Sequence, residues 1–184
     1  MSAINLRALN RSLASLIGIP VHELADLERV LRDEGLFEAG KPGPGGGTEA
    51  TPQAATTLIL AILAADSHRK AARSVPTYLS LPIFGEKCCR FTGACTFGDA
   101  IRRALESPSI AEGVQQLEVF RNEDIAFIDY KRPDGDGGDT RFGEGIETEK
   151  LHLSVRAQLS GTVIKKIADL LNGALSQEGE TNSK

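Results

Sequence analysis

The chain has 184 residues and a formal net charge of −4, with 41% hydrophobic and 25% charged side chains. This length suits one domain or two small ones, and the composition allows most of the chain to bury a core. No apolar run reaches the roughly 18 residues of a membrane span, and Met1–Asn10 lacks the order of a signal peptide, so we expect a cytoplasmic protein. The net negative charge excludes a general attraction to phosphate.

Two short amphipathic helices are predicted at the N-terminus. Apolar residues recur at helical spacing from Asn5 to Ile17, where Asn5 or Ser2 can cap the helix and Gly18 can end it. A second helix begins near Val21 and ends at Gly35, a position that favours the left-handed conformation. Two helices joined by a turn of three or four residues have the spacing of a helix-turn-helix.

The loop Glu38–Thr51 is rich in glycine and proline, and its only cation is Lys41. The apolar helix that follows, Thr51–Ala65, starts with the favourable pair Thr51 and Pro52. Apolar residues lie on more than one of its faces, which indicates that it packs on two sides or pairs with a second copy. A basic stretch, His68 to Arg73, follows this helix.

The segment Leu13–Ala65 resembles the MerR-type winged helix-turn-helix, an arrangement also found in the N-terminal domain of lambda-type small terminase subunits. The resemblance rests on Leu13–Ile19 as first helix and turn, Leu24–Phe37 as recognition helix, the glycine-rich loop as wing, and Thr51–Pro52 as start of the next helix. It implies that the second helix enters the major groove of DNA and that the wing contacts the backbone or minor groove.

Candidate DNA contacts follow from this resemblance and from charge. His22 and Asp26 stand near the start of the second helix, where base edges are read, although acidic residues there repel phosphate. The candidate backbone contacts are cations: Arg11, Arg29, Arg32, Lys41, Arg69 and Lys70, with Arg7 and Arg73 nearby. Because a monomer has few cations, we expect a homodimer or higher oligomer, paired through the helix Thr51–Ala65 or through the C-terminal domain.

The second half of the chain changes from helical to strand periodicity. Residues Val75–Thr96 contain short apolar pieces interrupted by Pro76, Pro82, Gly85 and Gly93, and they predict an irregular connector. A helix over Thr96–Ser107 precedes strands at Val114–Arg121, Ile125–Lys131 and Lys150–Leu159, and a last helix spans Gly161–Leu171. We predict a three-stranded antiparallel sheet covered on one face by two helices, with the loop Pro133–Gly145 between strands.

Neither a metal centre nor an active site is predicted. Cys88, Cys89 and Cys95 are odd in number and clustered, so reduced thiols are expected, and they lack the paired spacing of zinc ligands. The acidic run Asp134–Asp139 departs from a calcium loop at two of its ligand positions, and the glycines of Gly40–Gly47 lack the Lys-Ser/Thr of a phosphate-binding loop. We therefore expect no enzyme activity and no cofactor.

The sequence predicts an α+β chain in four parts: a winged helix-turn-helix domain at 1–74, a connector at 75–95, an α+β domain at 96–175 and a polar tail at 176–184. The leading hypothesis is a sequence-specific double-stranded DNA-binding protein, a transcriptional regulator of the phage or prophage type in a bacterial cell or phage-infected host. One alternative is a small terminase subunit that recognises packaging sites. The other is a protein-interaction or assembly module that does not bind DNA.

Overall fold

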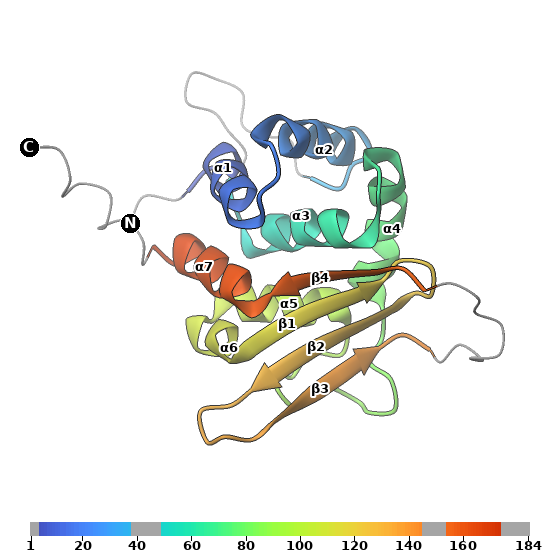
Figure 1. The fold of residues 1–184 in the computed structure, drawn as a ribbon, viewed down its shortest axis with the longest axis vertical. Coiled ribbons are helices and arrows are strands. Elements are labelled where there is room, and N and C mark those ends of the chain that lie inside the picture. Colours follow the sequence, from blue (N-terminus) through green and yellow to red (C-terminus); the bar gives the residue numbers. More distant parts are fainter. Residues whose placement is uncertain (1–3, 38–48, 145–153, 174–184) are drawn as a thin grey trace, which may run out of the picture.

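The computed structural model describes residues 4–37, 49–144 and 154–173 and has an α+β fold (Figure 1). Four helices come first: α1 (Leu6–Ile17), α2 (Val21–Asp33), α3 (Pro52–Ala64) and α4 (His68–Ser80). The second half contains α5 (Phe97–Glu106), α6 (Pro108–Gly113), β1 (Val114–Phe120), β2 (Ile125–Lys131), β3 (Gly137–Phe142), β4 (Arg156–Ser160) and α7 (Gly161–Leu171). The α+β prediction is confirmed, whereas the predicted wing Gly40–Gly47 and the tail 176–184 lie outside the described residues.

The helix ends follow the capping residues that the sequence offers. The Asn5 side chain accepts a hydrogen bond from the Ala8 amide at 2.8 Å, and the Thr51 hydroxyl accepts one from the Ala54 amide at 3.1 Å. These side chains satisfy amides that have no partner within their own helix. Gly18 closes α1 in the left-handed conformation, with φ of 72°. The predicted boundaries of α1 and α3 are confirmed within one or two residues.

The predicted connector begins too early, because residues 75–80 are the last six of α4. Pro76 lies inside this helix, and its missing amide is the reason that the sequence predicted a break there. Burial of Val75 and Tyr78, at 0% and 1% exposed, holds the helix together past the proline. The Tyr78 hydroxyl also donates to the Phe120 carbonyl at 2.6 Å and joins α4 to the end of β1.

The sheet has four antiparallel strands in the order β3-β2-β1-β4, one more than the sequence predicted. The extra strand, β3, comes from the loop Pro133–Gly145, where glycine and aspartate disfavour strands. It pairs with β2 from Lys131↔Gly137 to Ala126↔Phe142. The predicted strand Lys150–Leu159 is observed as β4 from Arg156, and residues 150–153 lie outside the described part.

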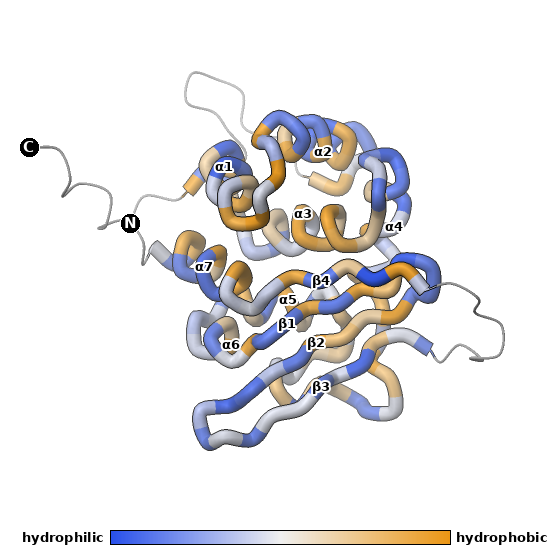
Figure 2. Tube along the Cα trace, in the orientation of Figure 1, coloured by the Kyte–Doolittle hydropathy of each residue, from blue (hydrophilic) through white to orange (hydrophobic). Residues whose placement is uncertain are grey.

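One core runs through the whole described chain. Figure 1 shows α3 between the pair α1 and α2 on one side and the sheet on the other, and Figure 2 shows it hydrophobic along most of its length. It contacts α4, α5, α7, β1 and β4, and its residues from Ala54 to Ala61 are all buried. Of the two alternatives for this helix, packing on two sides within one chain is therefore observed. The sequence predicted that two helices cover one face of the sheet, and α3 packs against the sheet as well.

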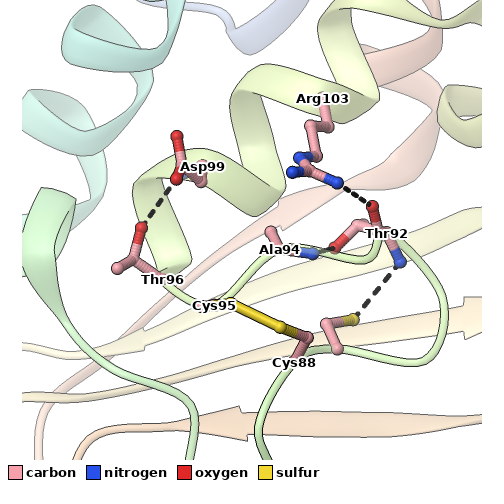
Figure 3. Close-up of a disulfide and its surroundings, with 8 residues drawn as sticks. Cys88, Thr92, Ala94, Cys95, Thr96, Asp99 and Arg103 are labelled. Atoms are coloured by element: carbon pink, nitrogen blue, oxygen red, sulfur yellow. Dashed lines mark hydrogen bonds between the residues drawn. A yellow bond between two sulfur atoms is a disulfide. The ribbon is translucent and has the colours of Figure 1, made fainter.

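Cys88 and Cys95 form a disulfide, contrary to the expectation of three reduced thiols (Figure 3). A tight turn between them brings their Cα atoms to 4.3 Å, with hydrogen bonds of 2.7 Å from the Cys89 amide to the Ala94 carbonyl and from the Gly93 amide to the Cys89 carbonyl. Gly93 makes this turn with φ of 72°. Arg103 of α5 secures it by donating to the Thr92 carbonyl at 3.2 Å. Only Cys89 is a free, buried thiol.

Candidate nucleic-acid interface

Helix α2, the predicted recognition helix, buries Leu24, Leu27 and Leu31 and exposes its opposite face. His22 and Asp26 lie on this exposed face, as the helix-turn-helix interpretation requires. The helix carries two arginines and four carboxylates over Val21–Asp33, so its own net charge is 2 − 4 = −2. Such a surface repels phosphate unless cations from other elements lie beside it.

Both predicted cations of α2 are already engaged with acids of the same helix. Arg29 forms an ion pair with Asp26 at 3.2 Å, and Arg32 forms one with Glu28. Glu28 also accepts a hydrogen bond from the Asn10 side chain of α1, which ties the two helices together. Exposed ion pairs of this kind are weak. Phosphate can therefore displace Asp26 from the Arg29 guanidinium at a small cost in free energy.

Helix α4 differs from α2 in charge, because it holds three cations and no carboxylate. Its buried side is formed by Ala71, Ala72, Val75 and Tyr78, while Arg69, Lys70 and Arg73 are exposed. Lys70 forms an ion pair with Asp66 at 3.0 Å. The hydrogen bond from Lys70, more than its charge, lowers the pKa of the Asp66 carboxyl.

A hollow of about 400 Å³ beside α4 gathers cations from distant parts of the sequence. Lys70, Arg73 and Ser74 of α4 line it together with Arg121 and Asn122, which follow β1. Arg121 donates to the carbonyls of Leu63 and Ile62, at 2.8 Å and 3.3 Å, and so places its charge at the C-terminal end of α3. With three cations and the single carboxylate of Asp66 in its lining, this hollow is suited to an anion.

Two further hollows have different chemistry. One of about 320 Å³ separates α2 from the corner between α3 and α4, and its lining is mainly apolar, with Leu24, Leu27 and Ala61. The other, of about 420 Å³, is lined by Glu123, Asp124 and Glu144 as well as two hydroxyls. The carboxylates that line the hollow of about 420 Å³ make it unfavourable for phosphate, so of these three hollows the one beside α4 is best suited to an anionic ligand.

The structure thus divides the predicted DNA contacts among several surfaces. Arg11 is exposed on α1, four residues lie on α2, and Arg69 with Lys70 lies on α4, which packs against α2. Lys41 lies outside the described residues. Arg121 was absent from the predicted set, since no local pattern in the sequence indicates that the end of β1 meets α4. Tertiary packing alone brings it there.

Metal-ligand groups and membrane-spanning helices are both absent from the described residues. No group of three or more His, Cys, Asp or Glu side chains in residues 4–37, 49–144 and 154–173 is arranged to hold a metal ion. In the same ranges, the helices are too short or too polar to cross a membrane.

Comparisons with known proteins give no relative from which a function could be transferred. No protein-family model matches the chain, and neither a curated protein nor a solved structure matches it.

Proposed function

We propose that the chain binds double-stranded DNA, with the outer side of α4 on the phosphate backbone and the exposed face of α2 beside it at the bases. The observation that carries this proposal is the group of three cations that line the hollow at α4, namely Lys70, Arg73 and Arg121, with Arg69 exposed on the same helix. Lysine and arginine side chains that neutralise phosphates supply most of the sequence-independent affinity for DNA. A transcriptional regulator of the phage or prophage type is the role that the winged-helix resemblance favours.

The two helices have separate roles in this proposal. Arg73 and Lys70 neutralise phosphates, which fixes the position of the protein without reading sequence. His22 and Asp26 lie exposed on the N-terminal half of α2, where a side chain can reach base edges in the major groove. Asp26 can accept a hydrogen bond from the amino group of cytosine, once Arg29 has moved from Asp26 to a phosphate.

A fluorescence anisotropy titration with random and genomic duplexes, at several salt concentrations, tests the proposal. Arg73→Ala removes a cation that lines the hollow without breaking the Lys70–Asp66 ion pair. We expect binding to weaken on all duplexes and the slope of log K against log salt to fall by about one. Lys166→Ala is the matched control, because it removes an exposed cation of α7, away from α4.

Two results would contradict DNA binding at this surface. The first is no binding of the folded protein to any duplex at low salt. The second is an equal loss of affinity in the Arg73→Ala and Lys166→Ala variants, which would indicate a general charge effect instead of a site at α4.

A second candidate function, a protein-interaction module, is favoured by the acidic face of α2. Its net charge of −2 and the pairing of Arg29 with Asp26 suit a basic protein surface better than phosphate. Absence of DNA binding at low salt would favour this alternative.

A further inference from the structure

The sheet has a second face that no described helix covers, and Figure 1 shows this face toward the viewer. Side chains alternate along each strand, so the residues that point away from the core are fixed by the register. We call their surface the open face, and its main residues are Gln116, Glu118, Phe120, Phe127, Asp129, Asp139, Arg141, Arg156 and Gln158.

Two aromatic rings lie on the two central strands of the open face, towards the end at which β1 stops. Phe120 and Phe127 lie on neighbouring strands with ring centroids 5.8 Å apart. The Arg156 guanidinium lies over Phe120, 5.2 Å from its centroid. Arg141 lies opposite Phe127 in the register, and its guanidinium is over the half-exposed ring of Phe84 at 4.6 Å. Arginine and aromatic side chains of this kind are enriched at protein–protein interfaces.

Opposite charges stand at two diagonal corners of the open face. Arg156 is on the outer strand β4, level with Phe120; it forms an ion pair with Glu118 of β1 at 3.4 Å, and its side chain stays 60% exposed. Asp139 is exposed on the other outer strand, β3, where it stands directly opposite Asp129. The basic corner and the acidic corner are thus separated by the full width of the sheet and by one intervening row of side chains.

We infer that the open face is covered by the open face of a second copy of this chain, in a two-fold dimer that pairs Arg156 of each copy with Asp139 of the other. A two-fold axis along the remaining diagonal of the face exchanges these two corners. The same operation brings Phe120 of one copy near Arg141 of the other. The strands of the two sheets then cross at roughly 90°, which is a known packing of β-sheets.

The charges of the open face favour a second copy over a nucleic acid. Glu118, Asp129 and Asp139 would repel phosphate, although the rings beside them could stack on bases. Burial, and then the neighbouring charges of Asp139 and Glu118, raise the pKa of Asp129. A guanidinium from a second copy near this acidic corner would offset that repulsion.

The size of the face sets the expected strength of the dimer. Four strands of five to seven residues, about 4.8 Å apart, give a face of roughly 20 Å by 20 Å. The corresponding area is below the roughly 800 Å² per partner of a standard interface, so we expect a weak, reversible dimer. The dimer does not depend on DNA binding, and it can be tested without DNA.

Sedimentation velocity of the full chain between about 5 and 200 μM tests the inference. Arg156→Glu and Asp139→Lys each place like charges together twice in the dimer, and each should weaken self-association about tenfold or more. An equal mixture of the two single variants restores opposite charges at both corners, as does the double variant R156E/D139K. Both should therefore associate as the native chain does.

The control is Lys166→Glu, which reverses an exposed charge on α7. This helix packs on the other face of the sheet, so the change should leave association unchanged. Circular dichroism verifies that each variant is folded. A native chain that stays monomeric at 200 μM overturns the inference. That result is expected if residues of the same chain, or another ligand, cover the open face. Single variants that associate normally, or a mixture that fails to restore association, overturn it too.

Discussion

At the scale of single residues, the clearest unfavourable contact is between Asp129 and Asp139. The two carboxylates stand directly opposite each other on β2 and β3, and like charges in such a pair cost roughly 0.2–1 kcal/mol. Asp129 is half-buried, and burial is the largest cause of its raised pKa. The folded chain therefore binds the Asp129 proton more tightly than the unfolded chain does.

Asp129→Asn is expected to stabilise the protein at pH 7 by about 0.5 kcal/mol, or about 1–2 °C in Tm, because it removes this repulsion. Stability linked to Asp129 is present at low pH and is lost as the pH rises through its raised folded-state pKa. The difference between variant and native chain should therefore vanish in acid, where Asp129 is protonated in both states. Thermal unfolding from pH 3 to pH 7, at low micromolar protein, measures it, and a gain that is equal at all pH values contradicts this explanation.

At the scale of elements, helix α4 is stable in spite of a proline in its interior. Pro76 has no amide to donate to the Ala72 carbonyl, and a proline inside a helix costs about 3 kcal/mol relative to alanine. The residue is exposed, so its ring contributes no core packing. The energy that keeps α4 helical comes from its buried side, including the hydrogen bond of Tyr78 to β1.

Pro76→Ala should therefore raise the free energy of unfolding by about 1–3 kcal/mol, since it restores the missing hydrogen bond and the helical propensity. Urea titration followed by circular dichroism measures the change in midpoint, at an unchanged slope. Thr77→Ala, at the neighbouring exposed position, is the control and should change stability by less than about 1 kcal/mol. A loss of stability in Pro76→Ala would show that α4 depends on a bend at this residue.

The elements that were predicted correctly are those with a clear local signal in the sequence. Asn5, Thr51 and Ser160 accept hydrogen bonds from the first turns of α1, α3 and α7, as their types and positions indicate. Strands β1 and β2 have alternating patterns and were predicted almost to the residue. The strand β3 was missed because Gly137, Gly138 and Asp139 have low strand propensity, and pairing with β2 overrides that preference.

The candidate site was only partly predictable, for the same reason. The run of cations from Arg69 to Arg73 is visible in the sequence, and so is the acidity of α2. Arg121 joins those cations only because it reaches the carbonyls at the end of α3, a contact between residues 58 positions apart. The ion pairs within α2 follow from i,i+3 and i,i+4 spacing and could have been anticipated from sequence.

At the scale of the whole molecule, α3 determines how the two halves depend on each other. Its buried residues face α4 on one side and α5, α7, β1 and β4 on the others. A buried leucine or isoleucine contributes about 1.5–3 kcal/mol relative to the same side chain in water. Leu58, Ile59 and Leu60 of α3 are all at 0% exposure, so removing the second half of the chain would uncover a large apolar surface.

A fragment of residues 1–74, expressed alone, is expected to lose cooperative unfolding and to bind a dye for exposed apolar surface. The reason is that it keeps α3 but lacks four of the elements that cover it. Thermal scans and fluorescence with such a dye, compared with the full chain, measure both effects. A fragment that unfolds cooperatively and does not bind the dye would support an independent winged-helix domain at 1–74.

The position of α3 also matters while the chain is being made. Its last residue, Ala64, leaves the ribosome roughly 90 residues before the first residue of β4, and α7 follows later still. At the usual rate of synthesis this interval lasts about 5–20 s, during which the part of α3 that meets β4 and α7 has no permanent cover. A nascent chain in this state is a natural client for chaperones, and the final fold forms only after its last strand and helix have been synthesised.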